Sequence, residues 1–164
     1  MPHRLRMTYA CPSMPSEGDT LTPIELHVKK LRPTARLPRR ATPHATGLDL
    51  YACLDAPITL TRAPSIVPSG VAIEFPPGYD VQVRPRSGLS SKGVGVAFGT
   101  IDADYRGALL VTMWTFGDVE THEIHDGDRI AQLVIAQLAP VEIVEAAELT
   151  PTDRGDAGHG STGR

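Results

Sequence analysis

The sequence predicts a single all-β domain, either a sandwich or a barrel-like fold, and three observations support this prediction. The chain has 164 residues, enough for one ordinary domain with a core and too few for two domains of typical size. Its apolar segments are short, rich in Val and Ile and bounded by turn residues, and none carries apolar residues convincingly at helical spacing. Fifteen glycines and fifteen prolines are scattered along the chain, so little helix is expected.

Strands are expected where Val, Ile and other apolar residues form short runs, several of which alternate with polar residues as half-buried strands require. In chain order these segments are 24–28, 49–53, 57–60, 71–75, 79–84, 94–98, 108–116, 129–138 and 141–145. The segment RIAQLVIAQL at 129–138 could also form a helix. Its β-branched residues and the turn signal before it favour a strand.

The turns between these strands have specific chemistry. Pro68 and Gly70 in VPSGV suit the corner of a turn, and PPGY at 76–79 repeats the pattern. Asp126 and Gly127 in HDGD predict a tight hairpin immediately before the strand at 129–138. Many short strands separated by turns at this spacing are typical of an all-β sandwich or barrel-like fold.

Three regions are expected along the chain. Residues 1–22 show neither helical nor strand periodicity and are expected to form a disordered or loosely attached arm. Residues 23–148 carry the strands and form the β domain. From 149 to 164 the sequence becomes polar and glycine-rich, which predicts a flexible C-terminal arm.

Composition excludes several classes of function. Sixteen Lys and Arg against nineteen Asp and Glu give a net charge of −3, so no general attraction to nucleic acid or to an anionic membrane is expected. No run is long enough to span a membrane, and the first twenty residues lack the apolar region of a signal peptide. Cys11 and Cys53 fit no metal-ligand spacing, and free thiols in a cytoplasmic protein are favoured over a single bridge.

Three polar segments interrupt the strands or follow them. The first, PRSGLSSKG at 85–93, presents Arg86, Ser87 and Gly88 in succession. A forked cation, a hydroxyl and an unobstructed backbone amide together suit phosphate oxygens. A solvated turn of the same composition is the alternative.

The second segment, GTIDADYRG at 99–107, lies between two expected strands. Its charged residues, Asp102, Asp104 and Arg106, could simply form a solvated turn. Ile101 and Tyr105 flank the acids with large apolar surface. A carboxylate in such surroundings can be partly desolvated and positioned as a general base.

The third segment, RGDAGHGSTGR at 154–164, places Arg154, Ser161 and Thr162 among four glycines. This composition suits phosphate, but no Gly-Lys-Ser/Thr step is present and no helix is expected to follow, so a P-loop is excluded. A disordered terminus is the alternative. His122 and His125 do not match the zincin helix pattern and are expected to be surface residues.

Taken in order, five segments resemble the five motifs of the trimeric deoxyuridine triphosphatases, also called dUTP diphosphatases. The resemblance extends from about Ile24 to the end of the chain, with all five motifs in the family's order and spacing. The segments are ATGLDL at 45–50, PRSGLS at 85–90, GTIDADYRG at 99–107, GDRIAQL at 127–133 and RGDAGHGSTG at 154–163.

The resemblance implies a jelly-roll-like β-sandwich that forms a homotrimer, with each active site assembled from three subunits. It implies Mg²⁺-dependent hydrolysis of dUTP to dUMP and pyrophosphate, which limits uracil in DNA and supplies dUMP for thymidylate synthesis. By the resemblance, Asp102 activates the water that attacks the α-phosphorus. Tyr105 packs under the deoxyribose and leaves no space for a 2′-hydroxyl.

The resemblance also implies roles for the other matched residues. Mg²⁺ is expected to be held mainly by the substrate phosphates, with Asp49 reaching its coordinated waters. The matched phosphate contacts are Arg86, Ser87, Gly88 and Gln132, and the uracil is read by the backbone around Thr100, Ile101 and Leu110. The C-terminal arm is expected to close as a lid whose γ-phosphate contacts are Arg154, Ser161 and Thr162.

The sequence departs from the family pattern at three positions. Val96 stands where many bacterial relatives have an Asn, so base recognition is expected to depend more on the backbone. Thr115 replaces another common Asn. His159 replaces the Phe that stacks on uracil, and we expect weaker or pH-dependent closure of the lid because imidazole is smaller and can be protonated.

Two other functions stay open on the sequence alone. One is a dCTP deaminase-type enzyme, which shares the fold and some motifs. The other is a catalytically silent relative that only binds nucleotides. The Asp-Tyr pair in GTIDADYRG argues against the first and the presence of Asp102 argues against the second.

Overall fold

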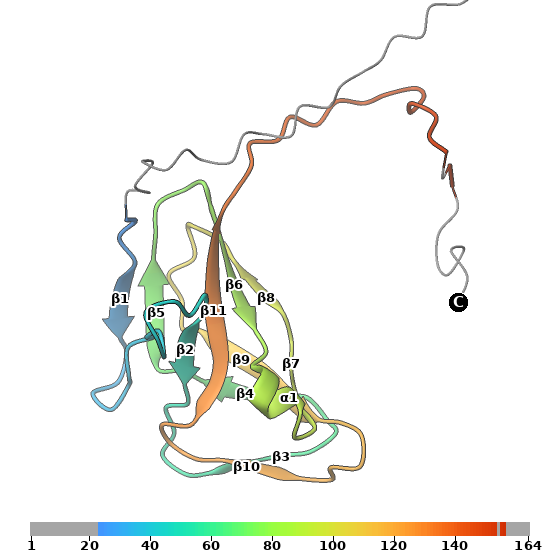
Figure 1. Cartoon of the computed structure of the whole chain (residues 1–164). Helices are drawn as coiled ribbons and strands as arrows, with labels where there is room; N and C mark the ends of the chain where they lie inside the picture. The colour runs from blue at the N-terminus through green and yellow to red at the C-terminus, as the bar shows by residue number, and fades with distance from the viewer. Residues whose placement is uncertain (1–22, 154, 157–164) are drawn as a thin grey trace, which may run out of the picture.

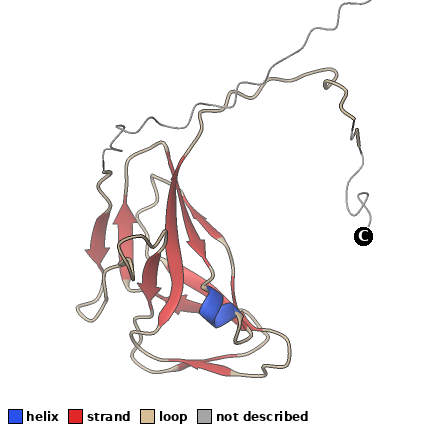
Figure 2. Ribbon diagram, in the orientation of Figure 1, coloured by secondary structure: helices blue, strands red, loops and turns tan. Residues whose placement is uncertain are grey.

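The computed structural model describes residues 23–153, 155 and 156, which form eleven strands and one short helix (Figure 1). The elements are β1 His27–Lys30, β2 Leu48–Tyr51, β3 Ile58–Leu60, β4 Ser65–Pro68, β5 Val71–Glu74, β6 Tyr79–Arg84, α1 Ser87–Ser90, β7 Val94–Val96, β8 Gly99–Ile101, β9 Leu110–Thr115, β10 His122–Ile124 and β11 Arg129–Gln137. Figure 2 shows that strands and loops dominate, with α1 a single turn of helix. The predicted all-β fold class is confirmed.

The strands form four antiparallel sheets. The largest has the order β2-β11-β6-β8, and a three-stranded sheet has the order β4-β9-β7. Two pairs, β1-β5 and β10-β3, complete the set. The long β11 lies between β2 and β6 and fixes their register, so that Gln132 stands opposite Asp49 on one side and Arg84 on the other. One row across this sheet thus joins three polar residues from separate parts of the sequence.

The core lies between the sheets and is filled by the inward-facing residues of each strand. In β9, Val111, Met113 and Thr115 are buried while the residues between them face outward, which is the period of two that a strand imposes. Trp114 lies on that outer face against Gly95, where a Cβ would clash with the indole ring. The fully buried aliphatic side chains include Leu50, Leu60, Val67, Val71, Val81, Val94, Ile124, Ile130 and Leu133.

The predicted turns are confirmed by the backbone, but the tight hairpin expected at Asp126 and Gly127 is wrong, because β10 pairs with β3 and β11 pairs with β2 and β6. Gly70, Gly78 and Gly127 have φ values of 69°, 90° and 79°, a left-handed conformation that favours glycine. Gly70 also packs against Cys53, whose side chain is buried and carries a free thiol. Cys11 lies outside the described residues.

The structure corrects several expected element boundaries. β1 begins at His27, three residues later than expected, and β4, β8 and β10 are strands that the pattern did not predict. The segment PRSGLSSKG, expected as a turn, contains the helical turn α1. Each missed element has only three or four residues, too few for a periodicity to be recognised.

The strand expected at 141–145 is absent from the described chain. After β11 the backbone leaves the body and runs away from the sheets (Figure 1). Val141, Ile143 and Val144 are 80%, 93% and 74% exposed, and no strand among the described residues pairs with them. An apolar segment without a partner cannot form a ladder.

No helix in the described part of the chain is long and apolar enough to cross a membrane. The expected arm at 1–22 lies outside the described residues, as do residues 154 and 157–164 of the arm expected at 149–164. The boundaries proposed for the three regions, 1–22, 23–148 and 149–164, therefore stay predictions.

We expect Leu133→Ala to lower the free energy of unfolding by about 2–5 kcal/mol, because it opens a cavity at a fully buried position of β11. Leu138→Ala, just beyond the same strand, should change it by less than about 0.5 kcal/mol, since that side chain is 57% exposed. Denaturant unfolding of the two variants measures both values. Equal losses of stability would contradict the placement of the core.

Candidate active site

The segment GTIDADYRG contains the tight turn between β8 and β9 and lines a cavity of about 220 Å³; it is called the hairpin below, although β8 pairs with β6 and β9 with β4 and β7. Its first residues are β8 and its last residues lead into β9. Five residues predicted for the site line this one cavity: Thr100, Ile101, Asp102, Tyr105 and Leu110. The cavity is completed by Val83, Gly99, Ala108 and Leu109.

Hydrogen bonds inside the hairpin fix Tyr105. Its amide donates to the Asp102 carbonyl at 3.0 Å and its hydroxyl donates to the Ala108 carbonyl at 3.1 Å. The Tyr105 ring packs against Gly107, where a Cβ would collide with it. The ring is therefore held at the cavity wall with 45% of its surface exposed.

Arg106 braces the same hairpin from outside. Its Nη1 donates to the carbonyls of Ala103 at 2.7 Å and Tyr105 at 3.0 Å, and its Nη2 lies 3.3 Å from a carboxylate oxygen of Glu74. The Asp102 side chain is exposed in the single chain. The partial desolvation expected for Asp102 is therefore not present within one copy.

A second group of predicted residues gathers around the buried carboxylate of Asp49. Arg86 donates from Nε to Asp49 Oδ1 at 2.9 Å and from Nη1 to the Arg129 carbonyl at 3.2 Å. Arg129 Nη1 lies 3.5 Å from the other oxygen, Asp49 Oδ2. The Asp49 side chain is only 11% exposed, so both guanidinium groups compensate a charge that has lost most of its water.

Gln132 connects this group to the turn before α1. Its amide Nε2 donates to the Pro85 carbonyl at 2.9 Å, and Gly47 leaves room for the Gln132 side chain where a Cβ would collide. Ser87 and Gly88 follow as the exposed first residues of α1. Asp49, Arg86 and Gln132, which come from three of the quoted segments, are thus brought together.

Two charged clefts adjoin Asp49. One, of about 570 Å³, is lined by Arg36, Leu37, Arg39, Ala41, Asp49, Tyr51, Gly127, Asp128 and Arg129. The other, of about 300 Å³, is lined by Arg86, Leu89, Lys92, His122, Glu123, Ile124, Asp128 and Arg129. Arg129 borders both clefts, yet sequence reasoning gave it no role although it stands within GDRIAQL.

The Asp102 cavity and the Asp49 group lie at opposite edges of the four-stranded sheet. β8 and β2 are the two edge strands, with β6 and β11 between them. Three strand spacings correspond to about 14 Å. The structure therefore brings the predicted residues together in two groups within one chain rather than in one.

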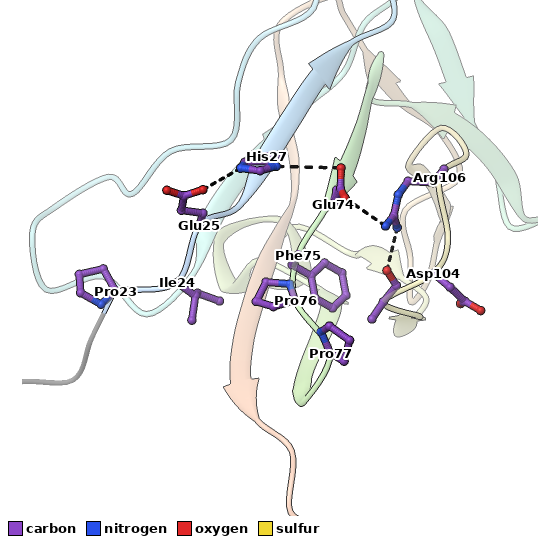
Figure 3. Close-up of a pocket in the computed structure, with 11 residues that line it drawn as sticks. Pro23, Ile24, Glu25, His27, Glu74, Phe75, Pro76, Pro77, Asp104 and Arg106 are labelled. Carbon is purple, nitrogen blue, oxygen red and sulfur yellow. Dashed lines mark hydrogen bonds and ion pairs between the residues drawn. The ribbon is translucent and has the colours of Figure 1, made fainter.

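A further cavity of about 790 Å³, larger than the three described above, contains only residues that sequence reasoning did not select for the site (Figure 3). It lies between the chain before β1, the end of β5 and the Asp102 hairpin. Figure 3 shows His27 between Glu25 and Glu74, and Glu74 in turn facing Arg106. The His27 ring lies 2.9 Å from a Glu25 carboxylate oxygen, and Glu74 contacts Arg106 at 3.3 Å, so the ion pair of Glu74 with Arg106 joins β5 to the hairpin.

The remaining predicted residues, Arg154, His159, Ser161 and Thr162, lie outside the described part of the chain. Among the described residues, no three or more His, Cys, Asp or Glu side chains are grouped to hold a metal ion by themselves. Asp49 is the residue for which a role near Mg²⁺ was expected.

The family model for dUTPase matches residues 34–163, a range that includes all five quoted segments. The chain belongs to the dUTPase family. Deoxyuridine 5′-triphosphate nucleotidohydrolase of Hydrogenobaculum sp. is 49% identical over 143 residues, covering 85% of this chain and 99% of the relative. The enzyme of the same name from Syntrophotalea carbinolica is 46% identical over 144 residues, covering 85% and 97%.

Solved dUTPase structures have the same fold. The Staphylococcus bacteriophage 80alpha dUTPase with dUpNHpp has a TM-score of 0.72 and 28% identity, covering 85% of this chain and 99% of that one. A dUTPase variant from phage phi11 of S. aureus, described with a structural Mg(II) ion, has a TM-score of 0.67 and 26% identity, covering 76% and 97%. The β-sandwich of the dUTPase family is thereby confirmed for this chain.

We expect Asp49→Asn to lower the free energy of unfolding by about 1–3 kcal/mol, because Arg86 and Arg129 would face a neutral amide in a nearly buried position. The matched control is Asp55→Asn, whose carboxylate pairs with Arg32 but is 81% exposed. That control should cost less than about 1 kcal/mol. Denaturant titrations compare the two, and an Asp49 variant as stable as the control would contradict the Asp49 cluster.

Proposed function

We propose that the chain hydrolyses dUTP to dUMP and pyrophosphate, with Asp102 activating the water that attacks the α-phosphorus. The observation that carries the proposal is the hairpin cavity lined by Asp102, Tyr105 and three further predicted contacts, in a chain that belongs to the dUTPase family. A carboxylate is a suitable base when it lies within hydrogen-bonding reach of the water that it deprotonates. The dUpNHpp bound by the phage 80alpha dUTPase supports a nucleotide of this class as the substrate.

Uracil is read by the backbone of β8 and the start of β9. β8 pairs only with β6 among the described strands, so one of its edges keeps backbone amides and carbonyls available. The contacts are those around Thr100, Ile101 and Leu110. A fixed row of donors and acceptors matches uracil and mismatches cytosine, because the N4 amine and the unprotonated N3 of cytosine reverse the donor and acceptor at two positions.

The sugar is selected by Tyr105. The Tyr105 hydroxyl donates to the Ala108 carbonyl and its ring packs against Gly107, so the ring has little freedom to move away from the sugar. Close packing of a rigid ring against C2′ leaves no room for the hydroxyl of a ribonucleotide. UTP is therefore a poor substrate.

The triphosphate is held by Arg86, Ser87, Gly88 and Gln132. Asp49 would help to hold Mg²⁺ through a bound water, in keeping with the preference of this ion for one or two carboxylates together with substrate phosphates. Bound Mg²⁺ would neutralise charge on the phosphates during displacement. Arg154, Ser161 and Thr162 complete the γ-phosphate contacts, and His159 stacks on the uracil.

The active unit is a homotrimer with shared sites. Two observations support this part of the proposal. Asp102 and Asp49 lie at opposite edges of one sheet. A single nucleotide can therefore contact the Asp102 cavity of one copy and the Asp49 group of another copy more readily than both groups of the same chain. The apolar residues Val141, Ile143 and Val144 are exposed beyond the body, which suits packing against another copy.

In the cell, this activity would limit uracil in DNA and supply dUMP for thymidylate synthesis. Both roles follow from the removal of dUTP and the formation of dUMP. The cytoplasmic location expected from the sequence stays a prediction.

We expect Asp102→Asn to lower kcat for dUTP by about 10²- to 10⁴-fold while leaving the fold intact, because it removes the base and keeps its shape. Pyrophosphate release measured with dUTP, dCTP and UTP in the presence of Mg²⁺ tests the proposal, and dUTP should be strongly preferred. Asp104→Asn, on the same hairpin but outside the Asp102 cavity, is the control and should retain activity. Ammonia release from dCTP, or dUTP binding without turnover in the native chain, would refute the proposal.

We expect removal of residues 154–164 to lower kcat for dUTP by about 100-fold, because the γ-phosphate contacts that orient the substrate would be lost. The oligomeric state should not change. Steady-state kinetics and light scattering on the same preparation measure the two properties. A truncated chain with full activity would exclude a lid function for this segment.

A further inference from the structure

The cleft of about 570 Å³ beside Asp49 contains more positive charge than the motif residues explain. Three arginines line it: Arg36 and Arg39 from the segment before β2, and Arg129 from the start of β11. Arg36 and Arg39 belong to none of the five motif segments. Their presence in one cleft therefore needs an explanation of its own.

The guanidinium group of Arg36 contacts two neighbouring residues. Its central carbon lies 5.8 Å from the centroid of the Tyr51 ring, a cation–π arrangement. It also lies against Gly127, where a Cβ would collide with the guanidinium. Such a contact reduces the rotamer freedom of the side chain, so less entropy is lost when the group binds a ligand.

The carboxylates in the wall of the cleft do not account for these arginines. Asp49 is occupied by Arg86 and Arg129. Asp128 accepts a hydrogen bond from the His125 amide at 2.8 Å. Within the described part of the chain, neither Arg36 nor Arg39 forms an ion pair, although both line a concave surface.

The backbone of Arg39 pairs with that of Asp49, around which the proposed phosphate-binding residues gather. The pairing is an isolated antiparallel bridge, in which the Asp49 amide donates to the Arg39 carbonyl at 2.8 Å. The cleft therefore begins at the same carboxylate that the phosphate-binding residues surround. Arg36 and Arg39, which form no ion pair with the described residues, and the shared Arg129 raise the positive potential at this position.

We propose that this cleft is a phosphoanion subsite in which Arg36 and Arg39 bind either the terminal phosphate of the nucleotide or the pyrophosphate released from it. The inference rests on the proposed function only for the origin of the anion, which would come from dUTP. The expectation that the cleft binds a phosphoanion does not depend on that function. Guanidinium groups bind phosphate oxygens with two parallel hydrogen bonds, and Arg36 is already oriented for this. Arg36 and Arg39 thus extend the phosphate site beyond the residues of the motifs.

The test measures pyrophosphate binding by calorimetry on the full chain, without nucleotide and without turnover. We expect Arg36→Gln/Arg39→Gln to weaken pyrophosphate binding by about tenfold or more, since two charge-assisted contacts are lost. Arg62→Gln is the control, because Arg62 donates to the Gly117 carbonyl and does not line the cleft. Unchanged pyrophosphate affinity in the double variant, with the control also unchanged, would overturn the proposal.

Kinetics of dUTP hydrolysis distinguish the two sources of the anion. If the cleft binds the terminal phosphate of the substrate, the double variant raises the KM for dUTP and leaves the affinity for dUMP unchanged. If it binds the product, inhibition by added pyrophosphate weakens while the KM stays the same. A single Arg39→Gln variant provides the same readouts should the double variant fail to fold, because this exposed side chain makes no packing contact comparable to that of Arg36.

The proposed function and this subsite can fail separately. A chain that does not hydrolyse dUTP but binds pyrophosphate through Arg36 and Arg39 would refute the function and retain the subsite. A chain that hydrolyses dUTP with no change in either pyrophosphate affinity or KM on substitution would refute the subsite alone.

Discussion

The buried carboxylate of Asp49 is the constraint on which the phosphate end of this molecule depends. A charge that has lost most of its water must be compensated by groups held close to it. Arg86 and Arg129 supply that compensation from the turn before α1 and from the start of β11. Three segments that are distant in the sequence therefore keep a fixed arrangement because one side chain requires it. The clefts on either side of Arg129 exist as a result of this arrangement.

The second constraint is the strand order of the main sheet. With β2 at one edge and β8 at the other, the carboxylate cluster and the hairpin cavity are kept apart by β11 and β6. An edge strand leaves one row of backbone amides and carbonyls unpaired. These groups can form hydrogen bonds with a flat base, whereas an uncovered edge promotes aggregation by pairing with another chain. The brace from Arg106 to Glu74 holds the hairpin next to that edge. Rigidity at the base-reading end thus comes from ordinary hydrogen bonds around a tight turn.

Much of the fold and part of the site could be predicted from the sequence. Strands such as Tyr79–Arg84 can be predicted because apolar and polar residues alternate along them. The glycines with positive φ can be predicted from the turn sequences in which they stand. The elements that were missed, such as β10, are three or four residues long and owe their pairing to β3, which is sixty residues earlier in the chain. The motif residues were found by resemblance, but the contacts of Arg36 with Tyr51 and Gly127 arise only when three distant segments fold together. Exposure of 141–145 was missed because a strand-like pattern does not reveal whether its partner belongs to the same chain.

The contact of Trp114 with Gly95 has a practical consequence. This is the single tryptophan of the sequence, and it lies on the outer face of the three-stranded sheet rather than in the core. Its emission spectrum depends on the water around the indole and so reports on that face alone. The molecule therefore contains a native optical sensor that shifts toward the blue when another molecule covers this surface. No label needs to be introduced to follow such an association in real time.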